Sequence, residues 1–169
     1  MDRLPRTLTV LLITVVTIGF DQATKALARR YLAPGTLLPF AGDTFRLQYA
    51  ENTGAFLSLG ASLPDPWRHF VFTVLVGLFL LGLLVYLLAS QSLPSTAIIC
   101  LSWIFAGGAS NLIDRIAYDG RVIDFLNVGV GPLRTGIFNV ADMAITFGAL
   151  ILAVDSYRQK DPRAKVESP

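Results

Sequence analysis

The sequence is poor in charge and in cysteine, and both shortages restrict the class of protein. Asp, Glu, Lys and Arg make up 15% of the 169 residues, 53% are apolar and the mean hydropathy is +0.58. An average soluble domain carries about 25% charged residues. No charged side chain occurs between Phe70 and Ile113, and Cys100 has no partner for a disulfide. Composition therefore indicates a membrane protein without disulfide bonds.

The signatures of the commoner hydrolases and of nucleic-acid binding are also missing. The single histidine, His69, follows Trp67 and Arg68, a setting typical of an anchor at a membrane surface. There is no H-E-x-x-H sequence for zinc, no G-x-S-x-G sequence for a serine nucleophile and no Cys/His cluster. The net charge is +2, with no basic stripe of interleaved aromatics. We therefore expect no metal, no cofactor and no nucleic acid.

Four apolar segments are long enough to cross a bilayer if their polar residues are included. A span of about 30 Å of hydrocarbon needs about 20 helical residues. The predicted helices lie near residues 7–29, 69–89, 96–114 and 136–157. A cleaved signal peptide is disfavoured for the first segment, because no small-x-small site precedes Asp21. We expect one all-α membrane domain over residues 1–169.

The connections between these helices are unequal. The longer ones, near residues 30–68 and 115–135, would both lie on the same side of the membrane. Polar and apolar residues alternate from Thr44 to Tyr49, which predicts a strand in a small extracytoplasmic β-sheet. For the second connection we expect a loop or helix. Basic residues occur on both sides, so the positive-inside rule gives no orientation.

Helical spacing predicts that several buried acids are paired. Asp21 and Lys25 are four residues apart and share a helix face, so an ion pair would lower the cost of burying either. Asn111, Asp114 and Arg115 fall at i, i+3 and i+4, which offers Asp114 a cation on its own helix or a neighbour. We interpret these acids as structural support.

Two further acids lack such a partner. Asp142 has no cation within four positions on its helix, and Asp124 stands between Ile123 and Phe125. Two carboxyl groups close together in a partly dry site share one proton, which makes them an acid and a base. One would take a proton from water as the water attacks a carbonyl, and the other would donate to the carbonyl oxygen and the leaving nitrogen. This predicts a metal-free aspartic protease.

Five blocks of the sequence, in order over about 120 residues, resemble the lipoprotein signal peptidase (signal peptidase II) family. They are Asp21-Gln22-Ala23-Thr24-Lys25, Asn52-Thr53-Gly54-Ala55, Gly107-Gly108-Ala109-Ser110-Asn111-Leu112-Ile113-Asp114-Arg115, Val122-Ile123-Asp124-Phe125 and Phe138-Asn139-Val140-Ala141-Asp142. The resemblance implies a bacterial cytoplasmic-membrane endopeptidase that cuts diacylglyceryl-modified prolipoproteins immediately before the lipidated cysteine. It also implies cytoplasmic termini, an extracytoplasmic active site and inhibition by globomycin-type cyclic peptides. We expect a monomer surrounded by membrane lipids.

The same resemblance implies a role for each matching residue. Asp124 and Asp142 would be the catalytic pair. Substrate binding or orientation of the pair would fall to Asn52, Gly54, Asn111, Arg115 and Asn139. Asp21, Lys25 and Asp114 would support the site. Two positions depart from the usual pattern, because Phe56 replaces a small residue and Met143 replaces a frequent serine.

Two alternatives come from other classes of protein. A proton-coupled transporter or channel component would also carry acids within its helices. Against it, the acids gather at one side of the membrane and the second helix is free of charge along its length. A purely structural membrane subunit would not explain an unpaired Asp142.

Overall fold

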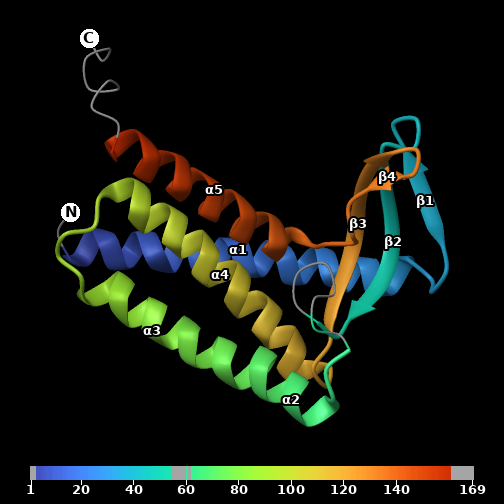
Figure 1. Ribbon diagram of the computed structural model, residues 1–169, viewed down its shortest axis with the longest axis horizontal. Coiled ribbons are helices and arrows are strands. Elements are labelled where there is room, and N and C mark those ends of the chain that lie inside the picture. The colour runs from blue at the N-terminus through green and yellow to red at the C-terminus, as the bar shows by residue number, and fades with distance from the viewer. Residues whose placement is uncertain (1–2, 55–59, 61, 161–169) are drawn as a thin grey trace.

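The computed structural model, which describes residues 3–54, 60 and 62–160, consists of long helices with a small sheet across one end (Figure 1). The helical elements are α1 (Arg3–Tyr31), α2 (Asp65–His69), η2 (Phe70–Leu75), α3 (Val76–Ala89), α4 (Ser95–Ala117) and α5 (Val140–Lys160). The strands are β1 (Leu37–Phe40), β2 (Phe45–Asn52), β3 (Val122–Val130) and β4 (Leu133–Arg134). The helix α1 begins, and α5 ends, at the end away from the sheet.

Four helical segments of the described chain are long and apolar enough to span a membrane. They are Leu4–Tyr31, Asp65–Ala89, Ser95–Ala117 and Val140–Arg158. The four predicted helices are thereby confirmed, with different ends. The second span combines α2, η2 and α3, and begins after Pro64 with Pro66 in its first turn. Its π-helical turn η2 is a rare form that frequently occurs at functional sites.

The predicted start of the last helix, at residue 136, is wrong. The segment before α5 stays extended because Phe138 exchanges backbone hydrogen bonds of 2.8 Å with Leu126 of β3. The helix begins only at Val140, so Asn139 occupies the position immediately before it. Asp142 therefore lies in the first turn of α5, not several ångströms inside a longer helix.

The sheet is antiparallel throughout, with the order β1-β2-β3-β4. The strand predicted from Thr44 to Tyr49 is confirmed as part of β2. The prediction of a separate loop or helix near residues 115–135 is wrong, because this segment supplies β3 and β4 to the same sheet. Val122 to Phe125 are all buried, so no alternation marked them as a strand.

The helix α4 packs against α1, α3 and α5, and glycine permits its close approach to two of them. A Cβ atom at Gly107 would lie 2.8 Å from the Ile145 side chain of α5, and one at Gly108 would lie 2.7 Å from Leu80 of α3. The absence of side chains at these positions brings α5 against the next turn of α4, which carries Asn111.

Candidate active site

The side chain of Asp142 is fixed by the residue that caps its own helix. Asn139 Oδ1 accepts a hydrogen bond of 2.9 Å from the Asp142 backbone N–H, and the Asp142 carboxylate accepts one of 3.2 Å from the Asn139 backbone N–H. This reciprocal arrangement is a capping box, with aspartate in place of the usual glutamate or glutamine. The positive end of the helix dipole also favours a negative charge at Asp142.

Asp124, on β3, is held at both carboxylate oxygens. Asn139 Nδ2 donates to Oδ1 at 2.6 Å, and Asn52 Nδ2 donates to Oδ2 at 3.0 Å. Burial raises the pKa of Asp124 from its ordinary 3.8 to about 7, and the negative charge of Asp142 contributes further in the same direction. Asp124 therefore holds a proton more readily than an exposed aspartate does.

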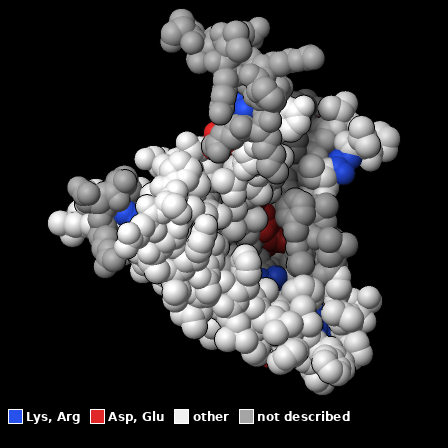
Figure 2. Space-filling model, turned by 60° about the vertical axis from the view of Figure 1, so that its left-hand side comes forward, with Lys and Arg blue, Asp and Glu red and all other residues white. Residues whose placement is uncertain are grey.

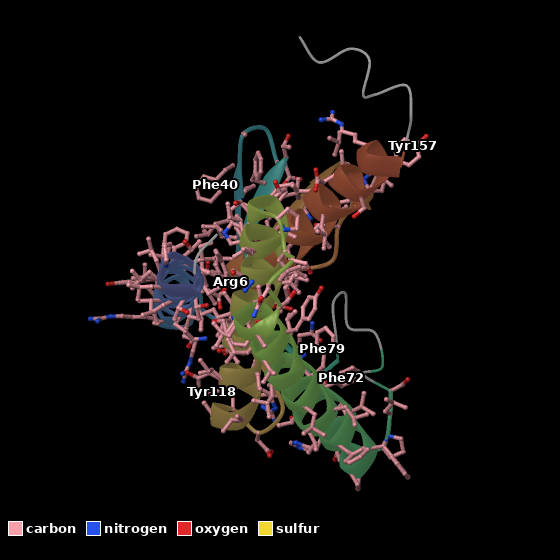
Figure 3. All side chains as sticks on the ribbon, turned by 90° about the vertical axis from the view of Figure 1, so that its left-hand side faces the viewer. Arg6, Phe40, Phe72, Phe79, Tyr118 and Tyr157 are labelled. Carbon is pink, nitrogen blue, oxygen red and sulfur yellow. The ribbon has the colours of Figure 1, made fainter. Side chains whose placement is uncertain are left out.

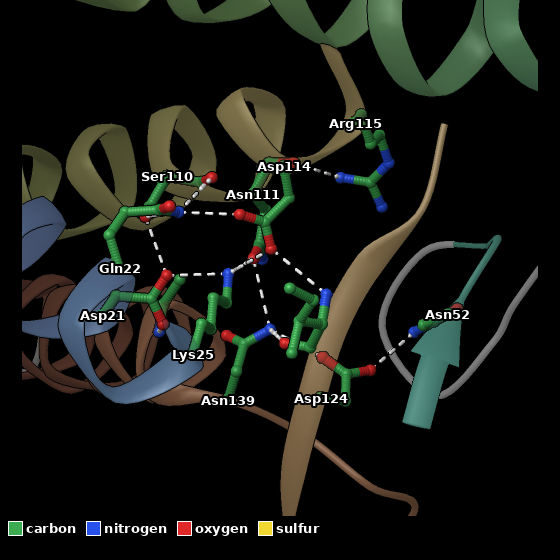
Figure 4. A network of polar contacts seen from close by, with 12 residues as sticks. Asp21, Gln22, Lys25, Asn52, Ser110, Asn111, Asp114, Arg115, Asp124 and Asn139 are labelled. Carbon is green, nitrogen blue, oxygen red and sulfur yellow. Dashed lines mark hydrogen bonds and ion pairs between the residues drawn. The ribbon is translucent and has the colours of Figure 1, made fainter. Parts of the chain in front are cut away.

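The two predicted catalytic aspartates are joined through asparagine side chains. Figure 4 shows Asn139 and Asn52 on either side of the Asp124 carboxyl group. Asn139 contacts both of them, and Asn111 Nδ2 donates to Asp142 Oδ1 at 2.9 Å. Asn111 Oδ1 in turn accepts from Asn139 Nδ2 at 3.2 Å and from Lys25 Nζ at 2.8 Å. Three helices and two strands thus meet at a pair of acids held by neutral donors.

Behind the pair lies a buried ion triad. Lys25 Nζ is 2.7 Å from Asp21 Oδ2 and 2.9 Å from Asp114 Oδ2, and all three side chains are at most 1% exposed. The Asp21–Lys25 pair matches the spacing argument. Asp114, however, pairs with Lys25 of α1 and not with Arg115 on its own helix. The first predicted possibility, a cation on the same helix, is therefore wrong for Asp114.

The triad also holds the backbone on which the two candidate catalytic residues stand. Asp21 Oδ1 accepts a 2.8 Å hydrogen bond from the N–H of Ala141, the residue before Asp142. Asp114 Oδ2 accepts a 3.1 Å hydrogen bond from the N–H of Ile123, the residue before Asp124. Each acid of the triad is thus one peptide unit away from one member of the pair.

Arg115 joins the helices to the end of β2. Its Nη2 donates to the Gly54 carbonyl at 2.7 Å, while the Gly54 N–H donates to Asn52 Oδ1 at 2.9 Å. The guanidinium lies 5.8 Å from the centroid of the Phe72 ring on η2. Arg115 Nε is buried without a hydrogen-bond partner in the structure, so this arginine keeps an unused donor next to the acids.

A cavity of about 440 Å³ opens beside Asp142, between η2, α3, α4 and α5. Figure 2 shows a hollow with acidic and basic side chains at its bottom. The polar part of the cavity is formed by Asn111, Arg115 and Asp142. From there it continues along α5 past Thr146 to Leu150, within the membrane-spanning segment. The cavity thus extends from the acids along a membrane-spanning helix.

All ten residues singled out in the sequence lie in one connected network. Two members were missed: Gln22 donates to Asp114 Oδ1 at 2.7 Å, and Ser110 donates to Asp21 Oδ2 at 2.7 Å. The sequence could have indicated both, because each is a polar residue in an apolar helix and stands next to a predicted site residue, Asp21 or Asn111. Met143 lies away from the network, in a second, apolar cavity between α1, α4 and α5. The departure at Phe56 lies outside the described residues.

Over residues 3–54, 60 and 62–160, no group of three or more His, Cys, Asp and Glu side chains is placed to hold a metal ion. His69 is far more exposed than the acids of the site, and its Nε2 lies 3.7 Å from Asp119 Oδ1. Its role as a membrane anchor stays a prediction.

Comparison with known proteins gives consistent matches over most of the chain. The model of a family described as signal peptidase (SPase) II matches residues 13–158. A lipoprotein signal peptidase of Paraburkholderia phymatum is 37% identical over 150 residues, which cover 87% of this chain and 86% of the relative. One from Brevibacillus brevis is 34% identical over 146 residues, covering 86% and 93%.

The fold resembles solved structures to a similar extent. A bacterial membrane enzyme solved by the in meso method at 2.3 Å resolution has a TM-score of 0.78 at 24% identity, with 91% of this chain and 92% of that chain covered. A second, at 1.9 Å, has a TM-score of 0.73 at 25% identity, with 87% and 91% covered. The arrangement of helices and sheet is therefore that of a known class of membrane enzyme.

Proposed function

Because the chain belongs to the signal peptidase II family and removes signal peptides from prolipoproteins, we propose that Asp124 and Asp142 are the pair that cleaves the peptide bond. The observation that carries this assignment is the placement of Asn139, which hydrogen-bonds to both carboxyl groups. One residue thereby holds both acids, Asp124 through its side-chain amide and Asp142 through its backbone N–H, and Asp142 lines the cavity. The family gives no support to a transporter.

In the proposed mechanism the two acids begin in different protonation states. Asp124 keeps the proton, because its pKa is raised to about 7. Asp142 carries the charge, which the amino end of α5 and the donors Asn111 and Asn139 stabilise. Asp142 takes a proton from a water molecule as the water attacks the scissile carbonyl, while Asp124 donates its proton to the carbonyl oxygen. As the C–N bond breaks, Asp124 takes a proton back from a hydroxyl of the tetrahedral intermediate and donates it to the leaving nitrogen, and the proton from water stays on Asp142, so the pair again holds one proton.

The neighbouring polar residues orient this chemistry. Asn52, Asn111 and Asn139 fix the carboxyl groups through the hydrogen bonds described above. Arg115 has an unused Nε donor beside the cavity, which suits it to bind a carbonyl of the substrate backbone. Gly54 places its own carbonyl on Arg115 and so links that arginine to the edge of the sheet.

Asp21, Lys25 and Asp114 act one step further from the substrate, as positioning residues. The hydrogen bonds to Ala141 and Ile123 give each carboxylate control over one of the two segments that carry the pair. Lys25 joins both carboxylates, so it sets the separation of those segments. Its charge also lowers the pKa of Asp124, although less strongly than the hydrogen bonds from the asparagines.

The cavity supports a substrate that stays in the membrane. The diacylglyceryl group of a modified prolipoprotein would remain in hydrocarbon while the bond before the lipidated cysteine reaches the acids. Globomycin-type cyclic peptides would occupy the same cavity. We place the sheet and the acids on the extracytoplasmic side and the ends of α1 and α5 in the cytoplasm, and we expect the chain to work as a monomer.

Two variants test the catalytic pair. Asp124→Asn and Asp142→Asn are each expected to give stable, membrane-inserted protein that does not cleave a prolipoprotein in a processing assay. Asp119→Asn is the matched control, because Asp119 is 88% exposed on the α4–β3 turn and should cleave normally. Substantial turnover by either of the first two variants would show that the pair is misassigned.

A further inference from the structure

One end of the sheet carries large apolar side chains in the open. Phe40 and Phe45 are each 51% exposed, Val130 is 75% exposed and Leu133 is 83% exposed. The two turns that carry them are joined by a 2.9 Å hydrogen bond from the Gly129 N–H to the carbonyl of residue 44. We call these four side chains the sheet tip. Exposed apolar groups gathered in this way mark an interaction surface.

The strand register places the sheet tip on one face. Phe40 pairs with Phe45, and Val130 pairs with Leu133, so each pair shares a face. Residue 128 pairs with Phe45 and is two positions from Val130, which puts both pairs on the same side. Counting back from Val130 in steps of two residues along β3, Asp124 lies on this same face. That face of β3 meets Asn139 at the start of α5.

The charged groups next to the sheet tip are paired with one another. Asp43, in the β1–β2 turn, accepts two hydrogen bonds of 2.6 Å from Arg46. Arg134 donates to the Asp43 carbonyl at 2.8 Å and to Asn127 Oδ1 at 2.6 Å. The hydrogen bond from Arg46 holds the pKa of Asp43 below its ordinary value, so the pair stays ionised at neutral pH. Pairing lowers the cost of moving these groups toward hydrocarbon.

The sheet lies at the depth where the spanning helices leave the bilayer. Only five residues separate the end of α1 from β1, and five separate β4 from α5, so these two connections hold the sheet close to the helix ends. In Figure 1 the strands run across the helices, and the hairpin ends project sideways beyond the start of α5. In Figure 3, Phe40 lies outside the outline of the helices.

We propose that the sheet tip inserts into the boundary between headgroups and acyl chains on the membrane side that holds the sheet. Apolar and aromatic side chains are favoured at this depth. The lipid-facing surface of α5, with Phe147 at 52% and Val154 at 51% exposed, is the neighbouring apolar surface. The inserted tip fixes the height of β3, and hence of Asp124, relative to the bilayer.

A spin label tests this placement. Leu133→Cys is labelled in a Cys100→Ala background, since Cys100 is 1% exposed and its loss removes a competing thiol. The protein is placed in lipid nanodiscs, where collision of the label with oxygen reports hydrocarbon and collision with a water-soluble nickel chelate reports water. We expect oxygen access to exceed nickel access several-fold at position 133. Asp119→Cys, labelled in the same way, should show the reverse.

A second variant shows whether the apolar tip is the cause. Val130→Asp, with the label still at position 133, should raise nickel access, whereas Val130→Ile should not. Two outcomes would overturn the proposal. One is nickel access at position 133 equal to that of the control at 119. The other is spin–spin broadening that disappears on dilution with unlabelled protein, which would mean that the tip contacts a second copy of the chain.

Discussion

Asparagine does as much as aspartate to define this site. Asn139 contacts both acids and caps α5, and Asn111 connects Asp142 to Lys25. A neutral amide can donate and accept hydrogen bonds at once. It therefore fixes a carboxyl group without adding a positive charge that would favour loss of the proton from that group. Asp124 can therefore keep a pKa of about 7.

The first prediction concerns pH. Because Asp124 has a pKa of about 7 and must be protonated to act as the acid, kcat/KM should fall as the pH rises above about 7. Asn52→Ala removes a donor that favours the ionised form of Asp124, so this alkaline limb should move to higher pH while the maximum rate falls.

Asn127→Ala is the control for this experiment. Asn127 is also buried on β3, but it bonds with Arg134 and with the carbonyl of Thr135 instead of the acids. The alkaline limb of the kcat/KM profile of Asn127→Ala should match that of the unmodified protein. A limb that stays in place, or moves to lower pH, in Asn52→Ala would contradict the assignment of Asp124 as the proton donor.

The second prediction concerns Lys25. Lys25→Met keeps an unbranched side chain, one atom shorter, but leaves Asp21 and Asp114 buried without their cation, so stability at pH 7 should fall by about 3–5 kcal/mol. Thermal unfolding in nanodiscs measures the loss.

Adding Asp114→Asn to Lys25→Met removes one of the two stranded charges and should restore part of the lost stability. Unchanged stability with lost cleavage in Lys25→Met alone would instead indicate that Lys25 takes a direct part in the reaction.

Spacing within one helix identified the Asp21–Lys25 pair from the sequence. The bond from Lys25 to Asp114 could not be predicted, because it joins helices whose rotations the sequence does not set.

At the scale of the element, the start of α5 shows what a local pattern can and cannot reveal. Asn139 and Asp142 fit the spacing of a capping box, and that spacing could have placed the helix start at Val140. Apolar residues upstream of Asn139 made a longer helix equally plausible. The tertiary pairing of Phe138 with Leu126 keeps the segment before Asn139 extended, and no local sequence pattern indicates that pairing.

The third prediction concerns the contact between α4 and α5. Gly107→Ala places a Cβ against the Ala141 backbone and the Ile145 side chain, so α5 must move and the 2.9 Å bond from Asn111 to Asp142 should lengthen. We expect cleavage to fall at least about tenfold with a stability loss of about 1–3 kcal/mol. A processing assay and thermal unfolding measure the two quantities.

Gly82→Ala is the matched control, because a Cβ at Gly82 meets nothing within 4 Å. Alanine there should leave cleavage unchanged and stability equal or slightly higher, since alanine favours a helix over glycine. Normal cleavage by Gly107→Ala would show that the α4–α5 distance does not control the acids.

For the whole molecule, hydropathy alone was enough to predict four spans, because the bilayer imposes a length on each. The acids were also correctly placed at one end, since antiparallel helices alternate in direction. The composition of the sheet was harder to predict. Strands buried on both faces, such as the first half of β3, lose the alternation that distinguishes a strand from a helix or loop.

The hydrogen bond from the Ala141 N–H to Asp21 joins residues 120 positions apart in the chain. On the ribosome, the first helix must therefore enter the bilayer long before the partner of its aspartate has been synthesised. Until then Lys25, one helical turn away, is the counter-ion of Asp21. Completion of the proposed catalytic centre must wait for translation of the final helix, so we expect a nascent chain released earlier to be inserted in the membrane but inert.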